Sequence, residues 1–271
     1  LEEYRFVTSY LGNQIRERGL NKPLWGLGRI YRVVYDGREK AKLPDFARAD
    51  SRRLVELLVD DNGWTRDTAQ RQIVESGNAN FAPLLRQLLV RAGKSRDRVS
   101  ALWCLEGLQQ LDAADAAQGL SDFDPQVRIA ALQAAEPLLR SARGSALVRT
   151  LRSRIDAEEP IVLAQAALTL GGTDDSAVLD LLRNMLPRAA EHPVLADSIL
   201  IAFRGHEIDV LLWVRTSMAV PERPLFGAQP LLESLAVHLV RAGAAATNEF
   251  VGTIAGSSLP QWCRLALLRR A

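Results

Sequence analysis

The side chains best suited to catalysis or metal binding are few in this chain and lie far apart. There are three histidines, His192, His206 and His238, and two cysteines, Cys104 and Cys263. No histidine stands in a recognisable frame with a serine or cysteine nucleophile, so we interpret all three as solvated or helix-capping residues. Each cysteine lies in an apolar helical context, which favours buried free thiols over a disulfide. Scattered in this way, these residues give no support to a zinc site.

Other motifs that carry chemistry are also missing from the 271 residues. There is no Cys-x-x-Cys-His string for covalent haem attachment, and without it we expect neither Met185 nor Met218 to be an axial haem ligand. Gly171-Gly172-Thr173 follows a helical pattern, which is typical of a helix C-terminus and not of a phosphate-binding loop. We therefore predict no catalytic, cofactor-binding or metal-binding residue, and we do not expect this chain alone to be an enzyme.

Arginine, in contrast, recurs in a regular frame. Asp124-Pro-Gln-Val-Arg-Ile-Ala-Ala131 aligns with Asn62-Gly-Trp-Thr-Arg-Asp-Thr-Ala69, which places Arg128 on Arg66. The same slot recurs at Arg66, Arg98, Arg128, Leu163 and Ala196. The spacing of 30 to 35 residues is typical of helical repeat architectures.

We interpret Arg66, Arg98 and Arg128 as a structural ladder, because a bidentate guanidinium suits contacts with an acid or carbonyl of a neighbouring repeat. The acids nearest in sequence are Asp67, Asp97 and Asp124. An anion or phosphate site is the alternative interpretation. The last two slots hold Leu163 and Ala196 in place of arginine, which argues against a long groove that binds successive phosphates.

From residue 50 onward, short amphipathic segments with helical periodicity alternate with Asp, Asn, Gly and Pro. Leucine-rich first helices alternate with alanine-rich second helices. One such pair cannot bury its apolar face alone, so the pairs must stack. The sequence predicts an all-α, α-α superhelix over residues 50–271 with about seven helix pairs.

Residues 1–49 differ from the rest of the chain. They hold ten cations and six anions, whereas the whole chain has a net charge of +2 and residues 50–271 a net charge of −2. We expect a helix over 3–17 and a strand over Arg29–Tyr35, closed by Asp36-Gly37. Because a lone strand is not stable, this segment is predicted to be a linker that belongs to a sheet outside these residues.

Several strings resemble known families. The Asp-Pro-x-Val-Arg-x-x-Ala frame resembles HEAT repeats of the short bacterial type. Residues 54–75, with Asn62-Gly-Trp64 and Arg66-Asp-Thr-Ala-Gln-Arg71, resemble the first HEAT unit of large bacterial sugar-dehydrogenase-like proteins. In those proteins a β-propeller similar to glucose/sorbosone dehydrogenases precedes the HEAT repeats, and a c-type cytochrome domain often follows. Residues 15–23 and 28–33 resemble the end of that propeller and its exit.

This resemblance implies a HEAT-repeat region of a larger, exported oxidoreductase of the membrane-bound dehydrogenase family. The parent would be a sugar-type dehydrogenase of the periplasm or cell envelope, using haem c and a quinone cofactor and passing electrons to a c-type cytochrome. These 271 residues would be its non-catalytic scaffold. Its partner would be a protein: the propeller, the cytochrome domain or another subunit.

A second column suggests where a partner binds. Arg71, Trp103 and Gln133 align on successive second helices, flanked by Glu106 and Glu136. We expect this column to line the concave face, although core placement of Trp103 is the competing interpretation. An exposed tryptophan beside an arginine is the chemistry of an interface hot spot.

Three other functions are considered. One is a stand-alone HEAT-repeat adaptor, and another is a HEAT-like nucleic-acid-binding protein or alkylpurine DNA glycosylase. The negative charge of residues 50–271 disfavours the latter, so we predict no nucleic-acid partner. A HEAT-like bilin lyase or chaperone does not fit the strand segment. No membrane span is expected, because the longest apolar run, Ile161–Leu170, is too short to cross a bilayer.

Overall fold

The computed structural model describes residues 12, 13, 16, 17, 37, 42–139, 145–172, 174–189, 192–217, 228–256 and 259–270. The chain divides into two compact units, residues 1–43 and 44–271. The helix expected over 3–17 and the strand expected over 29–35 fall almost wholly outside the described residues. The linker and propeller-exit interpretation of residues 1–49 therefore stays a prediction.

The described part of the second unit is all-α, with 15 α-helices, two short 3-10 helices and no strand. The 3-10 helices are η2 (Phe46–Arg48) and η3 (Ala79–Phe81). The α-helices are α2 (Ser51–Leu57), α3 (Gly63–Glu75), α4 (Ala82–Arg91), α5 (Ser95–Gly107), α6 (Ala113–Leu120), α7 (Pro125–Ala134), α8 (Glu136–Leu139), α9 (Ser145–Arg152), α10 (Pro160–Leu170), α11 (Ser176–Ala189), α12 (Pro193–Ala202), α13 (Glu207–Ser217), α14 (Ala228–Arg241), α15 (Ala244–Ala255) and α16 (Gln261–Leu268). The predicted all-α fold class is confirmed.

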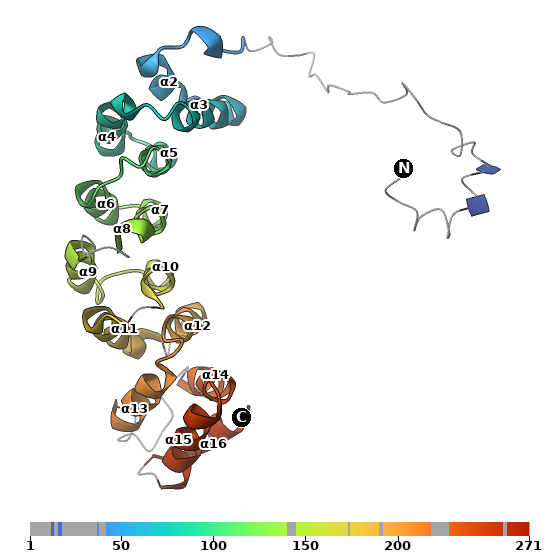
Figure 1. The fold of residues 1–271 in the computed structure, drawn as a ribbon, viewed down its shortest axis with the longest axis vertical. Coiled ribbons are helices and arrows are strands. Elements are labelled where there is room, and N and C mark those ends of the chain that lie inside the picture. Colours follow the sequence, from blue (N-terminus) through green and yellow to red (C-terminus); the bar gives the residue numbers. More distant parts are fainter. Residues whose placement is uncertain are drawn as a thin grey trace. The chain divides into compact units, whose positions relative to one another are not determined.

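The helices form two layers, which Figure 1 shows. The first helices of successive pairs, α2, α4, α6, α9 and α11, pack against one another in chain order. The second helices, α3, α5, α7, α10, α12, α14 and α16, form the other layer in the same way. This unit is therefore a helical-repeat solenoid.

The repeated frame marks where five second helices begin. Their first residues are Gly63, Ser95, Pro125, Pro160 and Pro193. Proline suits the first helical position because its missing N–H would have no partner there. In two of the five helices, the side chain of the preceding residue caps the helix: Asn62 accepts a hydrogen bond from the N–H of Trp64, and Asp124 accepts one from the N–H of Gln126. The arginine slot is thus the fourth residue of each of these helices.

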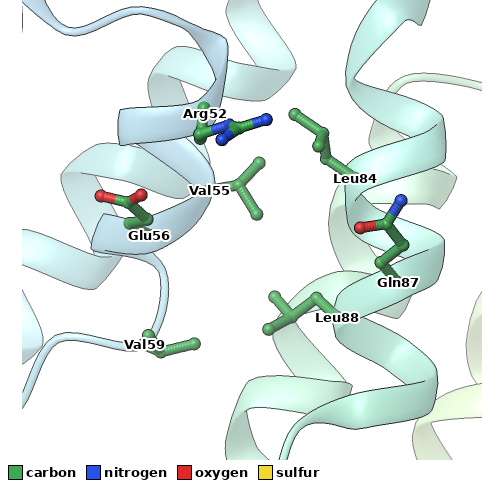
Figure 2. A pocket seen from close by; sticks show the side chains of 7 residues that line it. All are labelled: Arg52, Val55, Glu56, Val59, Leu84, Gln87 and Leu88. Atoms are coloured by element: carbon green, nitrogen blue, oxygen red, sulfur yellow. The ribbon is translucent and has the colours of Figure 1, made fainter.

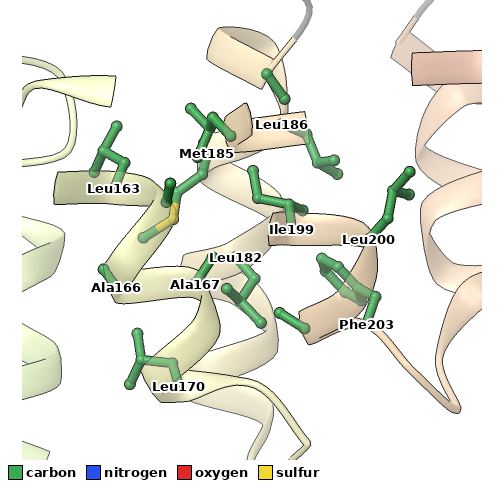
Figure 3. Close-up of a cluster of buried hydrophobic side chains, with 14 of the residues drawn as sticks. Leu163, Ala166, Ala167, Leu170, Leu182, Met185, Leu186, Ile199, Leu200 and Phe203 are labelled. Carbon is green, nitrogen blue, oxygen red and sulfur yellow. The ribbon is translucent and has the colours of Figure 1, made fainter. Parts of the chain in front are cut away.

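The core lies between the layers and between neighbouring second helices. Figure 3 shows the cluster where α10, α11 and α12 meet, with Leu182 and Met185 of α11 among the side chains of the other two helices. Ala166 and Ala167 of α10 are fully buried, as is Phe203 directly after α12. Small alanines bring neighbouring helices close, and each fully buried leucine contributes about 1.5–3 kcal/mol. Stability therefore depends on contacts between pairs as much as within them.

Two second helices approach each other closely at Gly171, the residue directly after α10. A Cβ atom at Gly171 would lie 2.6 Å from the Cα and 2.9 Å from the Cβ of Ala202. Because the clash involves backbone, Gly171→Ala must push α10 and α12 apart. We expect a loss of about 1–3 kcal/mol in the free energy of unfolding, measured by urea denaturation followed by circular dichroism.

Gly93→Ala is the matched control for this substitution. Gly93 lies in the loop between α4 and α5, and nothing stands within 4 Å of a Cβ added there. We expect its urea midpoint to stay near that of the wild type. Equal midpoints for both variants would contradict close packing at Gly171.

Candidate functional site: an arginine ladder and an open helix face

Each of the three ladder arginines forms a hydrogen bond with the loop that precedes its own helix. In each, Nη1 donates to the carbonyl oxygen six residues earlier, at 2.8 Å for Arg66, 2.8 Å for Arg98 and 2.9 Å for Arg128. Because the slot is the fourth residue of the helix, its side chain reaches back along the loop. Each of these bonds therefore stays within one helix pair.

Two of the arginines also bind carboxylates of the next pair. Nε and Nη2 of Arg98 donate to the two carboxylate oxygens of Asp122 at 2.6 and 2.9 Å. Nε and Nη2 of Arg128 lie 3.0 and 2.9 Å from Oε1 of Glu158. All four side chains are at most 9% exposed. These buried, charge-assisted bonds lock consecutive helix pairs together.

Arg66 differs, since among the contacts of the described residues it binds only carbonyl oxygens. At this step the link to the next pair is made by Asp61. Its carboxylate lies 3.1 Å from Nζ of Lys94 and 3.1 Å from Nη2 of Arg96. The hydrogen bond from Lys94, followed by that from Arg96, lowers the pKa of Asp61.

The acids closest in sequence are not the partners of these arginines. Asp67 is exposed, and Asp97 pairs with Arg96 at 3.1 Å. Asp124 caps α7, and its pKa is lowered chiefly by a hydrogen bond with the side chain of Ser95. The actual partners come from the next inter-helix loop, 24 and 30 residues further along the chain. Sequence proximity could not identify them, because helix stacking decides which loop meets the guanidinium.

The first-helix layer has a brace that the sequence analysis missed. Arg86 of α4 donates from Nε to Asp115 at 2.9 Å and from Nη2 to Asp112 at 3.1 Å. These two acids form the capping box of α6, with Asp112 at the N-cap and Asp115 three residues later. The Asp-x-x-Asp spacing was the available sequence signal.

A second missed contact joins the later pairs. Arg188, near the end of α11, donates from Nη1 to the carbonyl oxygens of Ile155 and Glu158 at 2.7 and 2.6 Å. It holds the same loop that supplies the carboxylate for Arg128. No sequence signal pointed to this contact.

The predicted partner column shares one register in the structure. Arg71, Trp103 and Gln133 are each the ninth residue of their helix, in α3, α5 and α7. Arg71 and Gln133 are exposed, and Trp103 is half-buried, so this tryptophan is not a fully buried core residue. Nε2 of Gln133 donates to Oε1 of Gln165 at 3.0 Å, and this hydrogen bond joins α7 to α10.

The two flanking acids occupy different settings. Glu106 is half-buried near the end of α5. Glu136 is half-buried and opens α8, a separate short helix. α7 stops at Ala134 because Pro137 has no N–H to continue the helix. Partner binding by this column stays a prediction.

Trp64, at the start of α3, is exposed, and its ring packs against the ring of Phe46. The ring centroids are 5.8 Å apart and the planes cross at 84°, the edge-to-face arrangement that aromatic pairs favour. The tryptophan thus packs on the short helix η2.

Both cysteines and His206 lie in the described part of the chain. Cys104 and Cys263 are free and buried, and burial raises their pKa values to about 12 and about 11. Nε2 of His206 lies 2.9 Å from Oδ1 of Asp174, a contact between neighbouring loops. Among the described residues no group of three His, Cys, Asp or Glu side chains could hold a metal ion. In the same residues, every helix is too short or too polar to span a bilayer.

A groove of about 430 Å³ lies on the first-helix layer, between α2 and α4 (Figure 2). Val55, Val59, Leu84 and Leu88 give it an apolar lining, with Arg52, Glu56 and Gln87 beside them. The predicted column lies on the other layer, so this groove is a separate feature.

Stacked helix pairs joined by inter-repeat arginines define a helical-repeat protein of the α-solenoid class. Residues 113–201, which span α6 to most of α12, match the family described as HEAT repeats. The chain therefore contains a HEAT-repeat region. No curated protein and no solved structure matches the chain significantly.

The ladder predicts a large stability loss when one buried partner is removed. Arg128→Ala leaves Glu158 buried with only its longer ion pair to Arg154, at 3.4 Å, so we expect a cost of up to about 3–5 kcal/mol. Glu158→Gln should also destabilise, and a double-mutant cycle from urea denaturation should show coupling between the two substitutions. Arg53→Ala, which breaks an exposed pair with Glu56, is the control and should change stability by under about 1 kcal/mol. Additive effects of the two ladder substitutions would contradict the pairing.

The thiols of both cysteines should react very slowly in the native state. Their raised pKa values keep both thiols protonated at pH 8, so almost no thiolate is present to react. Burial also blocks access of the reagent. Cys104 should react with Ellman's reagent roughly a thousandfold more slowly in the folded chain than in urea. Fast labelling of the native chain would contradict this placement.

Proposed function

We propose that this chain is a non-catalytic HEAT-repeat scaffold that binds a protein partner within a larger, exported oxidoreductase. In this proposal the partner is a c-type cytochrome, and the binding face is the open side of the second-helix layer. The observation that carries the proposal is the column of Arg71, Trp103 and Gln133, which share one register on three stacked helices.

The architecture supports a binding role. Repeat surfaces offer extended contact area, because each added pair lengthens the same face. The buried bonds of Arg98 and Arg128 fix the spacing between pairs, so a partner meets a preorganised surface that costs little entropy to order. Half-buried tryptophan and exposed arginine on that surface are residue types enriched in interface hot spots.

The same bonds disfavour nucleic acid as the partner. Binding to a phosphate backbone relies on accessible Lys and Arg side chains that neutralise phosphates and so release the counterions condensed on the nucleic acid. Arg98 and Arg128 are buried and already neutralised by carboxylates. The positions equivalent to them in α10 and α12, Leu163 and Ala196, carry no charge.

The oxidoreductase context rests on the strings at residues 15–33 and 54–75, which resemble the propeller exit and first HEAT unit of sugar-dehydrogenase-like proteins. In that context the chemistry lies outside this chain, in a propeller with a quinone cofactor and a cytochrome with haem c. The periplasm or cell envelope is the proposed compartment.

The proposal predicts that the column binds cytochrome. We expect the chain to bind a c-type cytochrome of the same organism, with a dissociation constant measurable by isothermal titration calorimetry. The double variant Arg71→Ala/Trp103→Ala should weaken this binding by at least about tenfold, because both hot-spot side chains are lost.

Val90→Ala/Arg91→Ala is the matched control, since it removes an exposed apolar side chain and an exposed cation from α4 in the other layer. It should leave cytochrome binding unchanged. Equal affinities for the two double variants would place the partner elsewhere on the surface. A wild-type chain that binds no c-type cytochrome would overturn the oxidoreductase context.

A further inference from the structure

Four large aliphatic side chains stand exposed on the second-helix layer. They are Ile161 and Leu168 of α10, and Val194 and Ile201 of α12. Each of these residues has between 46% and 63% of its surface exposed. The two helices are direct neighbours in the stack. We call these four residues the aliphatic patch.

The four residues of the aliphatic patch occupy equivalent positions on the two helices. Ile161 and Val194 are both the second residue of their helix, and Leu168 and Ile201 are both the ninth. A separation of seven residues places two side chains on one helix face, about 10.5 Å apart along the axis. Neighbouring second helices pack about 8–10 Å apart, so the four side chains form a compact two-by-two array.

The same two positions hold different chemistry in the earlier pairs. In α3 they are Trp64 and Arg71, in α5 Arg96 and Trp103, and in α7 Gln126 and Gln133. The residue types at the second and ninth positions of the second helices therefore change along the solenoid. They are aromatic and cationic in α3 and α5, amides in α7, and aliphatic in α10 and α12. An exposed apolar array of this kind is typical of interaction sites.

The centre of the patch carries a carboxylate. Asp197 lies between Val194 and Ile201 on the same face of α12, three residues after one and four before the other. It is exposed, and no other described residue pairs with it. On α10 the position equivalent to Asp197 holds the buried Ala164, and the amide of the next residue, Gln165, already bonds Gln133 and Thr169. The patch thus offers one solvent-exposed carboxylate beside four aliphatic side chains.

We propose that the aliphatic patch binds an amphipathic α-helix of a partner protein, with an apolar stripe for the four aliphatic side chains and a lysine or arginine for Asp197. The stripe of such a helix repeats at three, four and seven residues, which matches the spacing within α10 and α12. Apolar burial supplies the affinity, and the central carboxylate selects a cationic helix over an acidic one. This inference rests on the proposed binding role of the second-helix face, and it names the chemistry of the segment that would bind there.

A synthetic peptide tests the proposal directly. The probe is a helix-forming peptide of roughly 14 residues, with a single leucine stripe and lysines beside it, labelled for fluorescence anisotropy. We expect the wild-type chain to bind this peptide more tightly than a scrambled peptide of the same composition. The variant Leu168→Gln/Ile201→Gln should weaken binding by about tenfold or more, because two apolar contacts are lost.

Two further variants sharpen the test. Asp197→Asn should abolish the preference for the lysine peptide over its glutamate counterpart while leaving the aliphatic contacts in place. Val90→Gln/Leu265→Gln changes two equally exposed aliphatic residues outside the patch and should bind the peptide as the wild type does. Circular dichroism should show unchanged helicity for every variant.

Several results would overturn the inference. One is equal binding of the leucine-stripe and scrambled peptides, and another is binding that survives Leu168→Gln/Ile201→Gln. A wild-type dimer, detected by light scattering and lost in that double variant, would identify the patch as a self-association surface instead. Cytochrome binding that depends on Arg71 and Trp103, together with no peptide binding, would refute this inference and leave the proposed function standing.

Discussion

A helix pair in this protein is too thin to bury its own apolar side chains, and that constraint shapes the whole solenoid. Each pair must pack on the next, and the second helices can approach closely only where their side chains are small. Ala166 and Ala167 are fully buried, and Gly171 leaves no room for a Cβ against Ala202. Close approach in turn fixes the register between pairs, so equivalent positions on successive helices line up across the face.

The arginine ladder makes that register specific. Arg98 and Arg128 each hold the loop before their own helix and a carboxylate from the next pair. A buried ion pair adds little net stability relative to apolar packing, but a slipped register would strand a charge in the core. The ladder therefore penalises misstacked arrangements more than it stabilises the correct one. Arg86 and Arg188 extend the same principle to the first-helix layer and to the later pairs.

A fixed register leaves the open face free to vary in chemistry without disturbing the core. At the second and ninth positions of the second helices, side chains change from tryptophan and arginine through glutamine to isoleucine, leucine and valine. The two proposed binding regions are thus parts of one continuous face with different partner preferences. In the described part of the chain, the buried thiols and the contacts of His206 with Asp174 and Asp209 belong to the packing.

The sequence by itself determined the all-α class, the repeat period and the start of five second helices, because capping residues, helix-initial prolines and apolar periodicity are local signals. It also placed Arg71, Trp103 and Gln133 at one register position. Only the tertiary structure decided that Asp122 and Glu158, and not Asp67 or Asp97, meet the ladder, since those contacts span 24 and 30 residues. The tertiary structure likewise turned the apolar run Ile161–Leu170 into buried and exposed faces. Stacking is the reason in both cases: it selects which loop and which helix face each side chain meets, and no local pattern encodes that choice.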